Sequence, residues 1–325
     1  MTHFIKTRLI RKPFLLVLCG VLSIFSLSCG DSPPPAAVCE GVQPVTVRFV
    51  AVGDTGQGNQ GQLDVAAGIE KVCREQGCDF VVLLGDNIYE SGVAAIDDPQ
   101  WNIKFEEPYK NINVPFYAVL GNHDYGGNGA GNEFEKGAFE VAYSQHSAKW
   151  RMPASYYRYT TAAVDLFALD TNVMLFDREI ENQKTAFATW VSESKAPWKI
   201  AVGHHPYRSN GPHGNAGVYD GVMGRGQQVQ SFIDANVCGQ ADLYISGHDH
   251  SQQWQTESCK GTEIVVSGAG ASATLLPGTN ATQFQSATLG FLYVAATSNC
   301  GGPQTLQATF FDVTGQPSFS RTLTK

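Results

Sequence analysis

Five short segments of the sequence place aspartate, asparagine or histidine directly after a run of mostly apolar residues. They are Gly53-Asp54, Gly85-Asp86, Gly121-Asn122-His123-Asp124, Gly203-His204-His205 and Gly247-His248-Asp249-His250. One such segment alone would be an ordinary turn, because Asp and Gly are favoured in turns for backbone reasons. Carboxylates and imidazoles from five segments, packed together, would repel one another or stay unsatisfied without a cation. The set therefore predicts a metal site.

The apolar runs before these segments predict the elements that position them. The runs cover Val45 to Val52, Phe80 to Leu84, Phe116 to Leu120, Lys199 to Val202 and Asp242 to Ser246. Short continuous apolar runs are typical of strands buried on both faces in α/β proteins, and such folds bind ligands at the carboxyl ends of their strands. A helix is expected between the first two runs, where Leu63 to Gln76 has apolar residues at helical spacing.

Beyond residue 260 the sequence becomes rich in Gly, Ser and Thr. Strand-like runs occur there at Glu263 to Val266, Gly290 to Ala296, Thr305 to Val313 and Ser318 to Thr324. These runs predict a second, mainly antiparallel sheet packed on the first, so the expected fold class is an α/β sandwich. The sequence has no Gly-rich loop of the Walker type, and any phosphate chemistry must therefore depend on metal ions.

The order of the five segments resembles that of the calcineurin-like metallophosphoesterases. The shared pattern is GD, GDxxY, GNH, VxxH and GHxH, with Ala201 in place of the Val. Tyr89, three residues after Asp86, makes the sequence similar to the purple acid phosphatases in particular, and most similar to the small tartrate-resistant type. The resemblance extends from Val47 to Val294. It implies a four-layer α/β/β/α metallophosphoesterase sandwich with a single catalytic domain.

The resemblance implies a role for each side chain of the predicted metal site. Asp54, Tyr89 and His250 would hold Fe(III), Asp86 would bridge, and Asn122, His204 and His248 would hold a divalent ion, either Fe, Zn or Mn. The donor types agree with this division, because hard oxygen ligands suit the trivalent ion, whereas imidazole and amide oxygen suit the divalent one. Two such ions can share a hydroxide that attacks a phosphate ester.

The resemblance also places two histidines beside the substrate. His123 and His213 would bind the phosphate and protonate the leaving alkoxide, and Asp124 would orient His123. His205 is expected to support a neighbouring ligand rather than to bind metal. The implied function is that of an acid phosphatase, a phosphoric monoester hydrolase acting on small phosphomonoesters. Two alternatives remain open: a metallophosphodiesterase acting on cyclic nucleotides or phospholipid headgroups, and a non-catalytic lipoprotein that binds phosphate or metal.

The N-terminus has the features of an export signal. Residues 1–28 combine four basic residues with an apolar run from Phe14 to Leu27. Ser26-Leu27-Ser28-Cys29 is similar to a bacterial lipobox, although Ser26 stands where Leu is usual. The sequence predicts an exported protein, either a bacterial lipoprotein facing the periplasm or cell surface or a secreted protein. Residues 29–44 are Pro-rich and would form a tether, and residues 45–325 would form the catalytic domain.

The net charge of the chain limits the classes of molecule expected to bind it. Without residues 1–28 the formal net charge falls from −8 to −12, and an acidic surface argues against nucleic acid as a partner. We expect a monomer that binds small phosphomonoester substrates and reaches a membrane only through a lipid anchor.

Six cysteines follow the lipobox: Cys39, Cys73, Cys78, Cys238, Cys259 and Cys300. An even number in an exported chain predicts disulfides, of which Cys73 to Cys78 is a local candidate, and leaves the connectivity open.

Replacing Cys29 with serine tests the expected anchor. A lipidated protein sediments with membranes, and Cys29→Ser should move to the soluble fraction, because each buried CH₂ of an acyl chain contributes about 0.8 kcal/mol. Cell fractionation measures this, with Ser32→Ala as the control in the same segment. Equal partitioning of Cys29→Ser and the wild type would remove the support for a lipid anchor.

Overall fold

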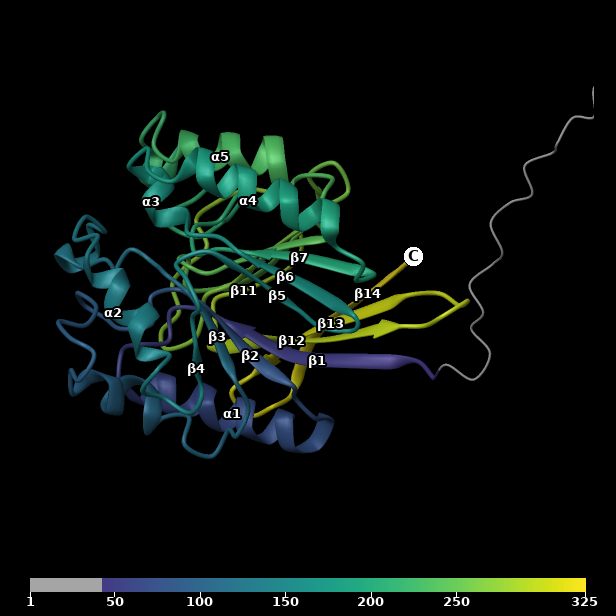
Figure 1. The fold of residues 1–325 in the computed structure, drawn as a ribbon, viewed down its shortest axis with the longest axis horizontal. Coiled ribbons are helices and arrows are strands. Elements are labelled where there is room, and N and C mark those ends of the chain that lie inside the picture. The colour runs from purple at the N-terminus through teal and green to yellow at the C-terminus, as the bar shows by residue number, and fades with distance from the viewer. Residues whose placement is uncertain (1–42) are drawn as a thin grey trace, which may run out of the picture. The chain divides into compact units, whose positions relative to one another are not determined.

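The apolar runs that end in the five polar segments all form strands in the computed structural model, which describes residues 43–325 (Figure 1). The strands lie in two seven-stranded sheets. The predicted signal segment, Cys29, Cys39 and the tether up to residue 42 lie outside the described residues.

The first sheet combines the beginning and the end of the described chain, in the strand order β14-β13-β12-β1-β2-β3-β4. Its strands are β1 (Val45–Val52), β2 (Phe80–Leu84), β3 (Phe116–Val119), β4 (Trp150–Arg151), β12 (Gly290–Ser298), β13 (Thr305–Asp312) and β14 (Pro317–Thr324). β1 to β4 run parallel, whereas β12 pairs antiparallel with β1 and leads into the antiparallel strands β13 and β14.

The second sheet has the order β11-β9-β10-β8-β7-β6-β5. Its strands are β5 (Tyr157–Thr160), β6 (Val164–Ala168), β7 (Trp198–Val202), β8 (Leu243–Ser246), β9 (Gln252–Gln255), β10 (Glu263–Ser267) and β11 (Thr282–Ser286). The four central strands β6, β7, β8 and β10 are parallel. The flanking strands β5, β9 and β11 are antiparallel to their neighbours.

The expected assignment of strands to sheets is wrong in one respect. The strands after residue 260 do not form a separate antiparallel sheet: β10 joins the parallel strands of the second sheet, and β12 to β14 extend the first. The five ligand-bearing strands are likewise divided, with β1 to β3 in one sheet and β7 and β8 in the other. Local apolar pattern identifies a buried strand, but it does not say which of two sheets the strand joins.

Helices cover the outer face of each sheet (Figure 1). α1 (Gln60–Gln76) packs on β12 and β13, and its first turn is capped by the Asn59 side chain, which accepts from the Gln62 amide. α4 (Ile180–Glu193), α5 (Gln227–Phe232) and η4 (Ile233–Val237) lie over the second sheet. The remaining helices are η1 (Asn102–Glu106), η2 (Gly127–Gly129), α2 (Lys136–Tyr143), α3 (Thr171–Leu175) and η3 (Tyr219–Gly221). The arrangement confirms the predicted α/β/β/α sandwich.

The two sheets are tied together beside the polar loops. The Ser267 hydroxyl at the end of β10 donates to the carbonyl of Ala51 in β1 (2.9 Å), and the Gly53 amide donates to the Ser267 carbonyl (2.8 Å). The five residues of β2 are fully buried, as are all four of β8, which explains their continuous apolar runs. These contacts bring the carboxyl ends of β1 and β10, one strand from each sheet, to the same edge of the sandwich.

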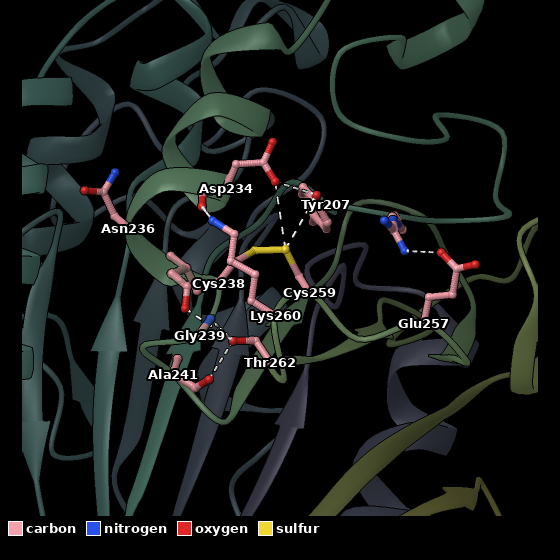
Figure 2. Close-up of a disulfide and its surroundings, with 12 residues drawn as sticks. Tyr207, Asp234, Asn236, Cys238, Gly239, Ala241, Glu257, Cys259, Lys260 and Thr262 are labelled. Atoms are coloured by element: carbon pink, nitrogen blue, oxygen red, sulfur yellow. Dashed lines mark hydrogen bonds and ion pairs between the residues drawn. A yellow bond between two sulfur atoms is a disulfide. The ribbon is translucent and has the colours of Figure 1, made fainter.

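Disulfides between described residues brace the outer layers. Cys73–Cys78 closes the end of α1, which confirms the predicted local pair, and Cys238–Cys259 joins the end of η4 to the turn before β10. Figure 2 shows Tyr207 and Asp234 beside the second disulfide, where the Tyr207 hydroxyl donates to Asp234 Oδ1 (2.6 Å). Because Cys238 and Cys259 are bonded to each other, they are not thiolate ligands. Between residues 43 and 325, the helices are all too short or too polar to span a membrane.

Candidate metal centre

The predicted ligands come from the loops that follow five parallel strands. Asp54, Asp86 and His248 have positive φ angles of 60°, 53° and 68°, a left-handed conformation that turns each side chain away from its strand direction. Glycines beside them leave the space that the side chains fill. A Cβ atom at Gly121 would lie 2.2 Å from Asp86 Oδ1, and one at Gly85 would lie 2.6 Å from His204 Nδ1.

One group of acceptors surrounds the phenol oxygen of Tyr89. Tyr89 Oη lies 3.1 Å from Asp54 Oδ1, 3.0 Å from Asp86 Oδ2 and 3.0 Å from His250 Nε2. A phenol has one proton to donate and therefore satisfies only one of these atoms. The Nδ1 atom of His250 lies 2.7 Å from the Ser272 hydroxyl. This hydroxyl in turn accepts a hydrogen bond from the side-chain amide of Gln57.

A second group of acceptors surrounds Nε2 of His204. It lies 3.0 Å from Asn122 Oδ1, 3.1 Å from His248 Nδ1 and 3.4 Å from Asp86 Oδ2. His204 Nδ1 lies 2.9 Å from the Leu84 carbonyl, so Nδ1 carries a proton and Nε2 offers a lone pair in the neutral ring. The Asn122 amide donates to the Gly129 carbonyl (2.9 Å), which turns its Oδ1 atom toward His204.

The two groups have the donor chemistry of a metal site. Each holds three acceptors around an atom that carries at most one proton, and Asp86 Oδ2 belongs to both groups. The nearest ligand atoms of Asp54, Asp86 and His204 all lie within 4.8 Å of one another, and these side chains are buried. A cation satisfies every acceptor at once, whereas protons satisfy only some of them. The structure thus brings together all seven residues predicted as ligands.

The electrostatics of the site reflect this excess of acceptors. Burial, and then the charges of Asp54 and Asp86, raise the pKa of Tyr89 well above its usual value. Burial by itself would lower the pKa of His204, but the charge and hydrogen bond of Asp86, together with the charge of Asp54 and the hydrogen bond to Leu84, outweigh burial and raise the pKa to about 9. Burial by itself would raise the pKa of Asp86, and His204 more than reverses this effect. A bound cation would favour the phenolate and the neutral imidazole instead.

His205 lies behind this second group. Its Nδ1 atom lies 2.9 Å from the Thr171 hydroxyl, and its ring centroid is 4.6 Å from that of His248. The ring nitrogens of His204, His205 and His248 are close enough to form a second potential ligand cluster. Burial, followed by the charge of His204, lowers the pKa of His205 well below its usual value, so this ring is neutral.

The contact expected between Asp124 and His123 is replaced by another arrangement. Asp124 is buried and accepts from the backbone amides of Asn87 and Ile88 (2.8 and 3.0 Å) and of Gly121 (2.8 Å). It thereby joins the loops after β2 and β3. His123 Nδ1 lies instead 2.7 Å from the carbonyl of Glu90. Asp124 is fully buried, and it does not belong to the residues that line the cleft described below.

Glu140 of α2 completes this support and was not predicted. It is fully buried, shares a hydrogen bond with Asp124, and accepts from the Asn87 side chain (3.1 Å). Burial, and then the charge of Asp124, raise the pKa of Glu140 well above its usual value, which favours the protonated form of this carboxyl. One sequence feature could have indicated that Glu140 is buried: it lies between Phe139 and Val141 in an otherwise apolar helix turn.

A cleft of about 480 Å³ opens beside the second acceptor group. Its walls include His213, Asp220 and Arg225 from one loop and Phe176 from another, together with Asn122 and His248. The structure therefore places His213 beside the ligands, as expected. His123 lies against Gly129 of the cleft wall, and its ring centroid is 4.2 Å from that of Tyr89.

Comparisons with known proteins agree with this geometry. A family model described as calcineurin-like phosphoesterase matches residues 47–252, a range that contains all seven predicted ligands. Purple acid phosphatase 4 of Arabidopsis thaliana is 30% identical over 249 residues, covering 70% of this chain and 69% of the relative. Tartrate-resistant acid phosphatase type 5 of Oryctolagus cuniculus is 28% identical over 327 residues, covering 88% and 93%. The solved structure titled "GAP50 the anchor in the inner membrane complex of Plasmodium" superposes with a TM-score of 0.68 at 21% identity, covering 86% of this chain and 88% of that one.

Substitutions at Asp124 and Glu140 test the support beneath the loops. Asp124→Ala leaves three backbone amides without an acceptor and should lower the free energy of unfolding by about 3 kcal/mol or more, since each buried unsatisfied group costs about 1–3 kcal/mol. Glu140→Gln should change it by less than about 1 kcal/mol, because the neutral amide reproduces a protonated carboxyl. Urea denaturation of both metal-free variants measures the difference. Equal losses of unfolding free energy in Asp124→Ala and Glu140→Gln would contradict a protonated, neutral Glu140.

Proposed function

Because this chain belongs to the calcineurin-like phosphoesterase family, we propose that it is an acid phosphatase that hydrolyses phosphate monoesters at a dinuclear centre of Fe(III) and a divalent ion. The position of Tyr89 carries the proposal. Its phenol oxygen lies between Asp54, Asp86 and His250. Oxygen ligands of this kind favour a hard trivalent ion. The similarity to purple and tartrate-resistant acid phosphatases supports the same assignment.

In this proposal the two acceptor groups hold the two ions. Asp54, Tyr89 and His250 would hold Fe(III), and Asn122, His204 and His248 would hold Fe(II), Zn(II) or Mn(II). Asp86, which belongs to both groups, would contribute to both sites. When bound, such a centre lowers the pKa of a coordinated water and offsets the charge of the phosphate. The hydrogen bond of His204 to Leu84 and that of His250 to Ser272 would keep each Nε2 atom free for this role.

Two histidines supply the proton chemistry. The Nδ1 atoms of His123 and His213 are bound to Glu90 and Asp220, so Nε2 is the nitrogen left to each ring for the substrate. In its cationic form, with a proton on each nitrogen, one ring donates a hydrogen bond from Nε2 to a phosphate oxygen. The other gives its Nε2 proton to the leaving oxygen as the phosphorus–oxygen bond breaks, and becomes a neutral imidazole. The Asp124 side chain has no part in this transfer and acts only through the loops it joins.

The proposal includes the location of the enzyme and its partners. The disulfides Cys73–Cys78 and Cys238–Cys259 support export, because disulfides persist in oxidising compartments. We place the protein outside the cytoplasm, as a lipoprotein or a secreted enzyme, acting as a monomer on small phosphomonoesters. The acidic composition disfavours nucleic acid as a partner.

A comparison of two substrates tests the activity. The metal-loaded protein should hydrolyse p-nitrophenyl phosphate at acidic pH and prefer it to bis(p-nitrophenyl) phosphate. His123→Ala should keep both metals and lose about 10²- to 10⁴-fold in kcat on alkyl phosphates, with a smaller loss on p-nitrophenyl phosphate, whose leaving group needs no proton. His146→Ala, an exposed histidine on another surface, is the matched control. A strong preference for the diester would indicate a phosphodiesterase, and binding without turnover a non-catalytic protein.

The visible spectrum tests the assignment of Tyr89. A phenolate bound to Fe(III) donates charge to the metal and absorbs visible light, so the oxidised protein should be violet. Tyr89→Phe should lose this absorption while keeping the far-UV circular dichroism of the wild type, and Tyr156→Phe should stay violet. A violet Tyr89→Phe protein, or a colourless wild type with a full complement of Fe(III), would refute the ligand assignment.

A further inference from the structure

The loop from His213 to Gly226 lies at the edge of the cleft and is anchored at a few buried points. Tyr219 is buried, and its hydroxyl donates to the Pro206 carbonyl (2.5 Å). The loop also closes on itself, since the Tyr219 amide donates to the Arg225 carbonyl (3.2 Å). At the other end, the amide of His213 donates to the buried carboxylate of Asp249 (2.9 Å). The backbone of His213 is thus fixed independently of its ring.

The ring of His213 has a separate partner, Asp220. His213 Nδ1 lies 2.7 Å from Asp220 Oδ1, and Arg225 binds the other carboxylate oxygen of Asp220 at 2.5 Å. The Asp220 amide also donates to the His213 carbonyl (2.9 Å). Asp220 has a φ angle of 55°, a left-handed conformation that Asp and Asn adopt more readily than most side chains. The backbone therefore directs this carboxylate at the histidine ring.

We propose that Asp220 is a positioning residue for His213: its carboxylate, held by Arg225, fixes the ring at the cleft with the proton on Nδ1 and Nε2 facing the substrate. The role of His213 toward substrate rests on the proposed function, whereas the geometry of the pair does not. A carboxylate only accepts hydrogen bonds, so a ring bound to it carries a proton on Nδ1, and the Nε2 proton that the role toward substrate requires is present in the cationic ring. The same logic makes aspartate the orienting partner of histidine in catalytic triads.

The other charged or titratable groups around the ring do not supply this contact. The His213 ring lies against that of His248, with centroids 4.1 Å apart and planes tilted by 31°, and His205 contacts the other rings of this group through His248. Asp249 accepts from the backbone amides of His213 and Gly214 and not from the ring. Arg225 binds Asp220 rather than the imidazole. Among the described residues, Asp220 is accordingly the carboxylate that contacts the His213 ring and determines which ring nitrogen carries the proton.

Asp220→Asn changes this contact while preserving the left-handed backbone. An asparagine side chain can donate its Nδ2 proton to His213 Nδ1, which moves the ring proton to Nε2. ¹⁵N NMR of histidine-labelled, metal-free protein distinguishes the two tautomers, with His213→Gln identifying the resonances. The wild type should show the Nδ1–H form and Asp220→Asn the Nε2–H form. An Nε2–H ring in the wild type, or no change in Asp220→Asn, would overturn the proposal.

Kinetics of the metal-loaded enzyme provide the second readout. Asp220→Asn should lower kcat about 10-fold or more on alkyl phosphates with little change in KM, and should have no further effect in a His213→Ala background. Arg225→Ala should show a smaller loss that Arg225→Lys restores in part. Asp177→Asn, an aspartate with a φ angle of 56° in a different loop, is the matched control. Independent, additive losses from Asp220 and His213 would contradict the proposal. If the wild type hydrolyses no phosphoester, the proposed function fails, and the NMR spectrum still decides the role of Asp220.

Discussion

A single carboxylate oxygen links the two halves of the site. Asp86 Oδ2 lies 3.0 Å from the Tyr89 phenol and 3.4 Å from His204 Nε2, and both contacts are buried. Tyr89 comes from the same loop as Asp86, whereas His204 follows a strand of the other sheet. The two sheets must therefore meet with their carboxyl ends at one edge. Burial of so many acceptors would oppose folding unless a cation or trapped protons occupied the space between them.

Much of the surrounding structure serves to hold these acceptors. Asp124 and Glu140 join the loops after β2 and β3 from below, and Ser267 joins β1 to β10 across the sandwich. The buried Asn210 donates its backbone amide to Gln253 Oε1 and its side-chain amide to Gln285 Oε1 at the protein surface. Buried polar groups of this kind contribute most when every member is satisfied. The metal loops are consequently placed by hydrogen bonds as well as by apolar packing.

The side chains that the structure brings together could be predicted from the sequence because most of them have two signals, their residue type and the apolar strand before them. Asp54, Asp86 and His204 all follow such runs, and the structure brings them together. The division of strands between two sheets was not predictable, since buried strands of either sheet have the same apolar pattern. The partners of Asp124 and Asp220 were also missed, because their contacts depend on loop conformation. Asp220 lies in a Gly-rich segment whose sequence indicates only an ordinary turn. Its role depends on the φ angle of Asp220 and on the position of Arg225, which the sequence does not give.

The central claim is that Asp86 belongs to both acceptor groups and holds two metal ions in one site. Elemental analysis of purified wild type, Asp86→Ala and the exposed control Asp97→Ala measures this most directly. The wild type and Asp97→Ala should each contain about two metal ions per chain, at least one of them iron, as expected for a two-metal phosphoesterase. Asp86→Ala should lose both ions or retain one weakly while keeping its fold. An Asp86→Ala protein that retains both ions, or a wild type that binds only one under saturating metal, would contradict the account.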